Sequence, residues 1–535
     1  MTNSVPEFED TSCFLITGSN TTEAHPLIAT RIIRAQKKGA KVIVVDPRKI
    51  QVAKMADIHL RQRPGTDVAW LNGMMHVIIE EGLHDQDFVQ GRTEGFEELK
   101  AAVADYTPER VEEISGIPAE DLRAAARLYA NAERSAILYA MGITQHTTGV
   151  DNVVSCANLA MLTGNVGKPG TGVNPLRGQN NVQGACDLGG LPNVYSGYQA
   201  VTIDAVQAKF KEAWGHAPPT RVGLTVTEMV DAAHHGDLKA LYILAENPMV
   251  SDPDLNHVRA ALEQCEFLVV QDIFPTETAQ LADVVLPGTT FVEKDGTFTG
   301  TDRRIQMVRQ AIEPLGESRA DWEIIADLAR RMGPRGNGAP YAGWEYGSPA
   351  AIMDEIAALT PIYGGSNFGR LEEEGFLQWP VPTADHPGTP YLHKDRFSRG
   401  LGHFTPVEFK EPAEAPDEEY PLTLTTGRIM FHYHTGSMTR RSEKLDREVP
   451  DGYVEISPED ADRLGIGKSE RVRVVSRRGE IETRAWITRR VPPGTVFIPF
   501  HFAEAAANML TNPALDPVAK IPEYKVAAVR VEKIA

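Results

Sequence analysis

A strand–loop–helix–strand pattern occurs twice in this chain, and it constrains the fold more than any other feature. In the first copy, residues 14–17 and 41–45 read as short buried strands, and a helical pattern lies between them. In the second copy, residues 241–244 and 267–270 read as strands in the same way. Each copy therefore predicts a βαβ unit, which requires parallel strands and a right-handed crossover.

The offset between the two copies is nearly constant along the chain. Asn247 stands in the second copy where Asn20 stands in the first, and Asp272 corresponds to Asp46 at an offset that agrees to within one position. A steady offset of this kind indicates an internal duplication. We therefore expect an α/β protein with two related Rossmann-like parallel-sheet domains. Each would carry a nucleotide-type cradle at its strand ends, so the chain would bind two nucleotide groups or keep one working cradle and one relic.

The loop after the first strand is Gly18-Ser19-Asn20, without the Gly-x-Gly-x-x-Gly fingerprint of NAD-binding proteins. A helix that starts there still presents backbone N–H groups to a phosphate. Asp46, at the end of the second strand, is placed to accept hydrogen bonds from a ribose. The alternative for Asp46 is a helix cap or turn residue.

The character of the chain changes after Pro421. Short strand patterns at 422–426, 454–457, 471–475, 480–487 and 494–499 are separated by turns, and they predict a small β-barrel. Residues of about 332–420 are rich in Pro and Gly and read as irregular connections. The expected domains are 1–180, the first Rossmann-like domain; 181–400, the second with irregular insertions; 401–420, a linker; and 421–535, the barrel.

One polar, glycine-rich stretch at 174–190 contains Arg177 among several Asn and Gln residues. It is too polar for a core strand and too rich in glycine for a stable helix. A guanidinium beside carboxamides suits a small planar anion held next to a large polar cofactor. The alternative is an ordinary surface loop.

Composition excludes several classes of protein. The net charge of −19 argues against a nucleic-acid partner, which needs a basic face. No run of 18 apolar residues and no signal peptide are present, so we expect a cytoplasmic protein without a membrane span. The four cysteines lack metal-ligand spacing, so no protein metal site is predicted and any metal would arrive with a cofactor.

These features together resemble the catalytic (alpha) subunit of molybdopterin-dependent formate dehydrogenases, over essentially all 535 residues. The motifs that carry the resemblance are the Gly18-Ser19-Asn20 junction, 45–48 (Val-Asp-Pro-Arg), 162–169, 426–428 (Thr-Gly-Arg), 434–438, 522–525 and above all 177–187 (Arg-Gly-Gln-Asn-Asn-Val-Gln-Gly-Ala-Cys-Asp). The last of these separates formate dehydrogenases from nitrate and sulfoxide reductases of the same superfamily. Cys186, inside this motif, is expected to be a buried thiol and not a metal ligand.

The resemblance implies two molybdopterin guanine dinucleotides (bis-MGD) on one molybdenum or tungsten, and two-electron oxidation of formate to carbon dioxide or the reverse. It implies that Arg177 is the catalytic residue that orients the formate carboxylate. The implied cofactor-binding residues are Gly18, Ser19, Asn20, Asp46, Pro47, Arg48, Gly65, Asp67, Met141, Gly142, Gln145, Gly178, Gln179, Glu246, Asn247, Asp272, Thr426, Gly427, Arg428, His434, Ser437, Met438, His501, Asn508, Tyr524 and Lys525.

Family members also carry an N-terminal 4Fe-4S segment and a selenocysteine or cysteine that ligates the metal, followed by a histidine. None of these occurs here. The expected partners are therefore formate and carbon dioxide, together with electron-transfer subunits or the upstream segment. One hypothesis is that Met1 is a gene-calling restart after an in-frame UGA codon. An upstream four-cysteine motif and a UGA followed by a histidine codon would support it.

Two other interpretations stay open. The chain could be a molybdopterin oxidoreductase for another small substrate, which the Arg177 motif argues against. It could also be a cofactor-binding fragment or scaffold without activity alone. Elements that should pack on an absent segment would leave apolar surface exposed, so we expect the isolated chain to be poorly soluble.

Overall fold

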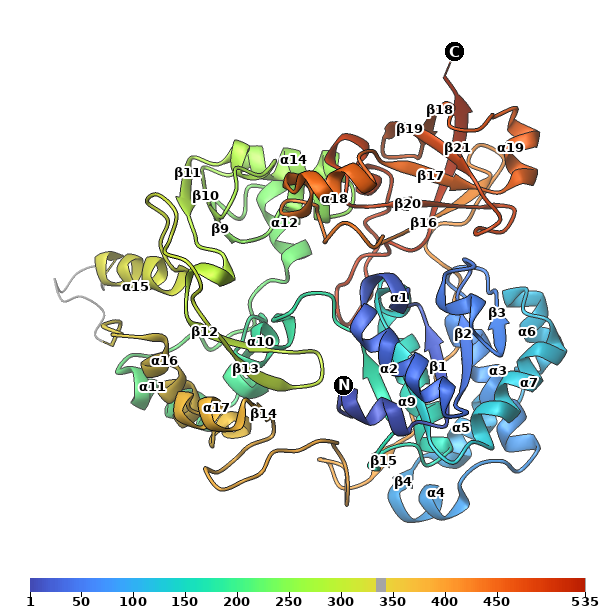
Figure 1. Ribbon diagram of the computed structural model, residues 1–535, viewed down its shortest axis with the longest axis horizontal. Coiled ribbons are helices and arrows are strands. Elements are labelled where there is room, and N and C mark those ends of the chain that lie inside the picture. Colours follow the sequence, from blue (N-terminus) through green and yellow to red (C-terminus); the bar gives the residue numbers. More distant parts are fainter. Residues whose placement is uncertain (333–342, 535) are drawn as a thin grey trace. The chain divides into compact units, whose positions relative to one another are not determined.

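The computed structural model describes residues 1–332 and 343–534 (Figure 1). The chain divides into two compact units, each described by itself. Unit 1 comprises Met1–Leu176, Pro248–Arg259 and Tyr391–Ala535, and unit 2 comprises Arg177–Asn247 and Ala260–Pro390. Within the described ranges, every helix is too short or too polar to cross a membrane.

Unit 1 contains a five-stranded parallel sheet of order β3-β2-β1-β5-β6. Its strands are Cys13–Thr17 (β1), Lys41–Val45 (β2), Ile58–Leu60 (β3), Ser135–Tyr139 (β5) and Gly172–Pro175 (β6). The helices around it are Thr21–Ala24 (α1), Pro26–Lys37 (α2), Asp67–Glu80 (α3), Gln86–Arg92 (α4), Phe96–Val103 (α5), Pro108–Ser115 (α6), Ala119–Ala130 (α7), Met141–Thr144 (α8) and Gly149–Leu162 (α9).

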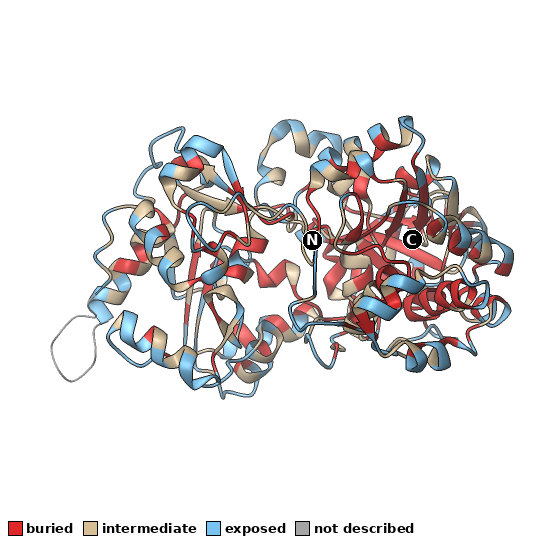
Figure 2. Cartoon of the chain, turned by 90° about the horizontal axis from the view of Figure 1, so that it is seen from below, coloured by how far each residue is buried: buried red, intermediate tan, exposed pale blue. Residues whose placement is uncertain are grey.

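Both faces of this sheet are buried, which explains its continuous apolar strands. Leu15 and Ile43 point to one core with Trp70 of α3, whereas Phe14 and Val42 point to the other core, which includes residues of α2. All five residues are fully buried. Figure 2 colours such buried residues red. The sheet therefore holds its strand ends, where the predicted cradle lies, on a rigid support.

The second copy of the pattern forms a three-stranded parallel sheet in unit 2, of order β11-β10-β9. Its strands are Ala240–Leu244 (β9), Phe267–Asp272 (β10) and Val284–Pro287 (β11), and Leu255–Gln264 forms helix α14. β9, β10 and β11 follow β1, β2 and β3 at the offset of the sequence repeat and adopt the same order. The prediction of two related parallel sheets is confirmed.

Single hydrogen bonds repeat between the two copies. The Val42 amide donates to Asp57 at 2.9 Å, and the Leu268 amide, at the equivalent position of the second copy, donates to Asp283 at 2.7 Å. Gly18 and its equivalent Ala245 follow the first strand of each copy with φ of 55° and 53°. The duplication therefore extends from the sheet order to the turns at the strand ends.

The chain outside the two parallel sheets and the barrel is more regular than predicted. Val182–Asp187 forms helix α10 inside the polar stretch, so the expectation that glycine prevents a helix there is wrong. The sequence predicts irregular connections over about 332–420, but 343–420 include Pro349–Leu359 (α16), Phe368–Glu374 (α17) and Gly402–His403 (β15). The predicted irregular range also covers 333–342, which lie outside the described residues. The other elements are Asp204–Trp214 (α11), Val226–His234 (α12), Asp321–Met332 (α15), Val194–Tyr195 (β7), Gln199–Ala200 (β8), Gly296–Thr299 (β12), Arg304–Val308 (β13) and Phe376–Gln378 (β14).

The C-terminal part of unit 1 is a closed barrel of order β16-β20-β17-β19-β18-β21, as predicted. Its strands are Leu422–Gly427 (β16), Tyr453–Ile456 (β17), Arg471–Val475 (β18), Glu480–Ile487 (β19), Thr495–Pro499 (β20) and Ala527–Lys533 (β21). Its helices are Glu443–Glu448 (α18) and Pro458–Leu464 (α19), and β4 (Thr93–Glu94) and α13 (Pro248–Ser251) complete unit 1. Ser457 caps α19 with Pro458 at its first position.

A buried ion pair connects the first sheet with the barrel inside unit 1. Arg48, just after β2, donates two hydrogen bonds, of 3.1 and 2.8 Å, to Glu455 of β17. The guanidinium carbon of Arg48 also lies 3.3 Å from the ring centre of Phe497. The side chain of Arg48 is 6% exposed and that of Glu455 is 0% exposed, so Arg48 depends on Glu455 for its solvation, while Glu455 also pairs with Arg490 at 3.4 Å.

Glu455→Gln should therefore destabilise unit 1 by about 3–5 kcal/mol, because it leaves Arg48 buried without a counter-charge. The matched control is Glu482→Gln, since Glu482 also pairs with two arginines, Arg471 and Arg473, but on the exposed surface of the same barrel. We expect the control to change stability by less than about 1 kcal/mol. Thermal or urea unfolding measures both, and equal effects would contradict the assignment.

Candidate functional site

The candidate site in unit 1 starts where β1 and β5 end side by side. Gly18 follows β1 and Gly142 lies in α8 after β5, and the Gly142 amide donates to the Gly18 carbonyl at 3.0 Å. A Cβ on Gly18 would lie 2.6 Å from the carbonyl carbon of Gly142, and one on Gly142 would lie 2.5 Å from the Cα of Gly18. Neither position accepts a side chain, so two bare backbones meet at the strand ends.

Polar groups gather around this glycine contact. The hydroxyls of Ser19 and Thr21 lie 2.9 Å apart, and the Nδ2 of Asn20 is buried without a hydrogen-bond partner among the described residues. A buried amide nitrogen that makes no hydrogen bond lowers the stability of the fold, unless a bound group accepts that hydrogen bond. Met141 and Gln145 flank Gly142 at the two ends of α8, and both are half-buried.

Asp46 and Pro47 follow β2, and Asp46 makes a turn contact there. Its Oδ1 accepts a hydrogen bond from the Arg48 amide at 2.8 Å. Burial raises the pKa of Asp46 to about 6, against the lowering effect of Arg48. The Pro47 carbonyl accepts from Arg61 at 3.2 Å. The charge of Arg48 is already balanced by Glu455, so this arginine anchors the loop.

Asp67 is the first residue of α3 and is 2% exposed. Its Oδ1 accepts from the Trp70 indole at 3.1 Å, and its Oδ2 lies 3.7 Å from Nε2 of His146. Burial raises the pKa of Asp67 to about 6 and lowers the pKa of His146. The preceding turn contains Gly65, at φ 86°, where a Cβ would lie 2.4 Å from the side chain of Pro412.

On the barrel side, the end of β16 brings together several predicted residues. The Thr426 hydroxyl donates to the Tyr524 carbonyl at 2.9 Å, and the Lys525 ammonium donates to the Thr426 carbonyl at 2.8 Å. Gly427 ends the strand, with the Phe497 ring 2.8 Å from an added Cβ. Burial and Arg428 lower the pKa of Lys525 to about 7.

Arg428 is a half-buried cation for which the described residues supply no carboxylate partner. No hydrogen bond or ion pair joins its side chain to another residue in the part of the chain that the structure describes. Burial lowers its pKa, and nearby it are His434 and Lys525, which carry no negative charge. A half-buried guanidinium in this setting attracts an anion from outside the protein.

Two histidines complete this side. The His501 Nδ1 donates to the His434 carbonyl, and its Nε2 accepts from the Ile429 amide at 3.0 Å, which fixes a neutral tautomer. Burial lowers the pKa of His434 and of His501 to about 3. His434 has φ 47°, so the chain turns sharply there. Both rings are therefore uncharged at neutral pH.

The remaining predicted residues of unit 1 have different surroundings. The Ser437 hydroxyl lies 2.9 Å from that of Thr435, and Met438 is exposed. Asn508 donates to the carbonyls of Val250 and Ser251, both at 2.9 Å, while its Oδ1 is buried without a partner among described residues. Asn508 therefore holds α13 and leaves one acceptor for another group.

Unit 2 contains Arg177 with Gly178 and Gln179, directly before α10. The Arg177 amide donates to the Thr301 hydroxyl at 3.1 Å, and its Nη1 lies 3.5 Å from the Sγ of Cys186 on α10. Arg177 is half-buried and Gln179 is exposed. The expectation of a buried thiol at Cys186 is wrong, because this side chain is half-exposed beside Arg177.

The network that holds α10 could not be found from the sequence. The buried carboxylate of Asp187 accepts from Gln183 at 2.8 Å, Tyr198 at 2.7 Å and Tyr363 at 2.8 Å. Asp187 lies within the Arg177 motif, so the sequence motif pointed to this residue. The two tyrosines lie far outside the motif's short pattern and gave none.

The second strand-end cluster comprises Glu246, Asn247 and Asp272. Asn247 is 4% exposed and engaged with Glu277 at 2.8 Å and the Thr278 hydroxyl at 2.7 Å. The Asp272 Oδ1 accepts the Ile273 amide at 2.6 Å. Glu246 is exposed. The structure thus places these residues at equivalent strand ends but uses two of them to shape turns.

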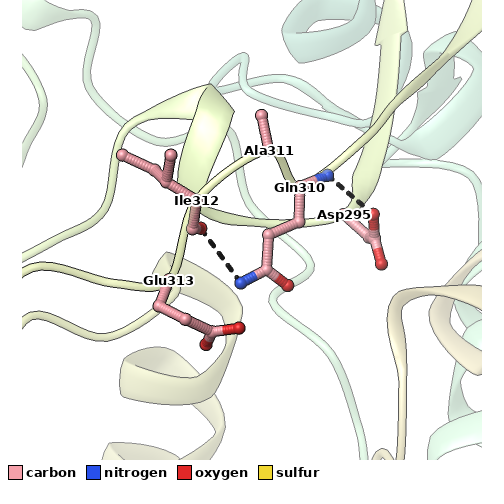
Figure 3. Close-up of a pocket in the computed structure, with 5 residues that line it drawn as sticks. All are labelled: Asp295, Gln310, Ala311, Ile312 and Glu313. Carbon is pink, nitrogen blue, oxygen red and sulfur yellow. Dashed lines mark hydrogen bonds between the residues drawn. The ribbon is translucent and has the colours of Figure 1, made fainter.

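A surface hollow of about 440 Å³ lies elsewhere in unit 2, lined by Asp295, Gln310, Ala311, Ile312 and Glu313 (Figure 3). Gln310 bridges it through hydrogen bonds to Asp295 at 2.9 Å and to the Ile312 carbonyl at 3.1 Å. None of the predicted site residues lines it, and its ionisable groups are two carboxylates. We assign it no role.

The raised pKa of Asp67 predicts how stability changes with pH. The folded chain retains a proton up to about pH 6 that the unfolded chain loses near 3.8, so stability falls as pH rises through this window. Asp67→Asn removes this loss. The variant's advantage should grow from near zero at pH 4 to about 3 kcal/mol at pH 7.

Urea unfolding at several pH values measures this difference, with the exposed Asp105→Asn as the control that should give a flat profile. An advantage for Asp67→Asn that does not depend on pH would contradict the assignment.

The chain is similar to known proteins along its whole length. Residues 1–331 match the family model described as molybdopterin oxidoreductase, and residues 422–528 match the molydopterin dinucleotide binding domain. Among curated relatives, the F420-dependent formate dehydrogenase 1 subunit alpha of Methanococcus maripaludis is 53% identical over all of this chain and 78% of its own length. Formate dehydrogenase H of Escherichia coli is 44% identical over all of this chain and 74% of its own length.

Among solved structures, the acetylene hydratase from Pelobacter acetylenicus has a TM-score of 0.77 and 24% identity, covering 98% of this chain and 78% of its own. That likeness supports the fold: two parallel-sheet α/β parts and a six-stranded barrel. The family models together span both repeats and the barrel. The chain belongs to the molybdopterin oxidoreductase family.

Proposed function

We propose that this chain is the catalytic part of a formate dehydrogenase, which interconverts formate and carbon dioxide at a bis-MGD molybdenum or tungsten centre. The observation that carries this proposal is the pair of related strand-end clusters together with the barrel, in a chain 53% identical throughout to a formate dehydrogenase alpha subunit. Two equivalent sheets suit two equivalent dinucleotides.

The residues of unit 1 fit a guanine dinucleotide. Gly18 and Gly142 give the close backbone approach that a pyrophosphate requires, and Arg428 is a cation without a carboxylate partner in the described ranges. The unsatisfied Nδ2 of Asn20 and Oδ1 of Asn508 add one donor and one acceptor. Asp46 and Asp67 are the acceptors for ribose hydroxyls or guanine N–H groups. The remaining members proposed for this cradle are Ser19, Pro47, Gly65, Met141, Gln145, Thr426, Gly427, His434, Ser437, Met438, His501, Tyr524 and Lys525, with Arg48 as its anchor.

The second dinucleotide would lie at the strand ends of unit 2. Glu246 is the exposed acceptor there, while Asn247 and Asp272 shape the turns that present it. Gly178 and Gln179, beside Arg177, would lie between substrate and cofactor. Gly18 and its equivalent Ala245 both have a positive φ, which supports the proposal that the two turns bind their dinucleotides in the same way.

In formate oxidation, HCOO⁻ becomes CO₂ and releases two electrons and a proton. The bound metal cofactor would supply the two-electron acceptor. Arg177 would hold the formate carboxylate through two parallel N–H donors, which fixes the C–H bond in one direction. Thr301 and α10 hold the arginine, and α10 is itself anchored through Asp187.

The proposal extends to the surroundings of the enzyme. Electrons would leave through a 4Fe-4S cluster on the upstream segment of the longer family members, or through partner subunits, and we propose a cytoplasmic location. The alternative is a cofactor-binding scaffold. The conformational anchoring of Arg177 favours an enzyme, because a scaffold has no need to fix a half-buried cation beside a thiol.

Arg428→Gln tests the cofactor site. Loss of a charge-assisted contact worth about 1.5–3 kcal/mol should weaken cofactor retention at least about tenfold. Pterin fluorescence per protein after gel filtration measures it. The matched control is Arg463→Gln in the same barrel, where Arg463 is 51% exposed and paired with Asp460. Equal pterin content in both variants would refute the role of Arg428.

Arg177→Lys tests substrate positioning in the metal-loaded enzyme. An ammonium cannot reproduce the two-donor fork, so kcat/KM for formate should fall about 100-fold or more while metal and pterin contents stay unchanged. Arg309→Lys, at an arginine that is 57% exposed and paired with Glu372, is the control and should retain activity. Unchanged formate oxidation in Arg177→Lys would overturn the assignment.

A further inference from the structure

One face of the second sheet, β11-β10-β9, exposes apolar side chains to solvent beside Gln271, which is buried and donates to Asp321 at 2.7 Å. In register across its parallel strands, Tyr242 pairs with Val269 and Val269 with Val284, so these side chains point to one side. The exposed members of this apolar face are Tyr242 at 40%, Leu244 at 43%, Phe267 at 47% and Val284 at 37%. On the opposite face, Leu268 and Val270 of the central strand are 1% and 0% exposed, whereas Val285 of β11 is 46% exposed.

The same face is fully covered in the first copy of the repeat. Leu15 and Ile43 occupy the positions equivalent to Tyr242 and Val269, and both are 0% exposed. They belong to one core with residues of several helices, among them α3 with Trp70, α7 and α9. After β3, the chain forms the long helix α3. After β11, it forms the short turn Phe291–Glu293 and the antiparallel strands β12 and β13 instead.

Besides this helical layer, the second copy lacks a strand partner on one side of β9 among the described residues. In the first copy, β1 pairs with β2 on one side and with β5 on the other. Within the described residues, its equivalent β9 pairs with β10 alone, so the backbone groups of its other edge have no strand beside them. An apolar face beside an open strand edge is a surface built to be covered.

We propose that the apolar face and the β9 edge bind an α/β polypeptide segment, which adds a parallel strand beside β9 and lays helices over Tyr242, Leu244, Phe267 and Val284. The relatives contain enough chain for this, because this sequence covers 78% of the length of the Methanococcus maripaludis protein. The occupant is therefore the part of such a relative outside the aligned region. The repeat alone calls for this occupant, and formate chemistry plays no part in it.

A second copy of this chain fits the surface less well. Two identical β9 edges related by a twofold axis would pair antiparallel. The first repeat requires a parallel neighbour in that position, as β5 is to β1. A second copy also supplies no helical layer equivalent to α3, α7 and α9 for the apolar face.

The experiment co-expresses the full chain with the unaligned part of the Methanococcus maripaludis protein as a separate polypeptide. We expect a 1:1 complex, with slowed amide hydrogen exchange in β9. Leu244→Arg/Phe267→Arg should weaken the complex at least 100-fold while leaving thermal unfolding of the chain alone unchanged, because both side chains are exposed. Leu27→Arg, at a leucine 82% exposed on α2, is the control that should leave binding intact.

The proposal is overturned if no complex forms, if β9 exchange is unchanged in the complex, or if the double variant binds as well as the parent chain. It is also overturned if the chain alone forms a stable dimer that the double variant dissociates. In that case the occupant is a second copy. None of these outcomes depends on formate oxidation, so this proposal and the proposed function can fail separately.

Discussion

The buried pair between Arg48 and Glu455 is the interaction on which the candidate site of unit 1 depends. It joins the loop after β2 to the barrel strand β17, and Phe497 covers the guanidinium. Because both charges are almost without solvent, removal of Glu455 would leave Arg48 buried without its hydrogen-bonded carboxylate. The pair therefore holds the strand ends of the sheet and the end of β16 inside one compact unit.

Some charged groups of this site are balanced by partners within the protein and others are not, and the unbalanced ones can bind a ligand. Arg48 is balanced by Glu455, whereas Arg428 has no carboxylate partner among the described residues, and Lys525 has a pKa lowered to about 7 by burial. Two carboxyls, Asp46 and Asp67, have their pKa raised to about 6. An incoming diphosphate would compensate the charges of Arg428 and Lys525. Ribose or base donors would satisfy the carboxyls of Asp46 and Asp67.

Much of the fold could be predicted from the sequence, because parallel strands buried on both faces read as short apolar runs. The strands predicted at 41–45 and 471–475 have the bounds that the structure shows. The helix α10 was missed, because its stability comes from tertiary contacts of Asp187 with Tyr198 and Tyr363 and not from propensity. The irregular reading of 343–420 failed because helices α16 and α17 are short and flanked by Pro and Gly.

The candidate site was harder to predict than the fold. Glycines at strand ends give a local signal, so Gly18 and Gly142 could be selected. Whether a charge is balanced depends on a partner far away in the sequence, as Glu455 is from Arg48, and no local pattern contains that information. Asn247 shows the same limit, because its engagement with Glu277 and Thr278 is visible only in three dimensions.

If each repeated cradle binds one dinucleotide, the chain holds two guanine nucleotides. Acid release of guanine nucleotide from the purified metal-loaded protein, quantified against polypeptide by mass spectrometry, tests it most directly. We expect two guanine nucleotides per chain. One nucleotide per chain would make the second cradle a relic, and none would contradict the cofactor assignment altogether.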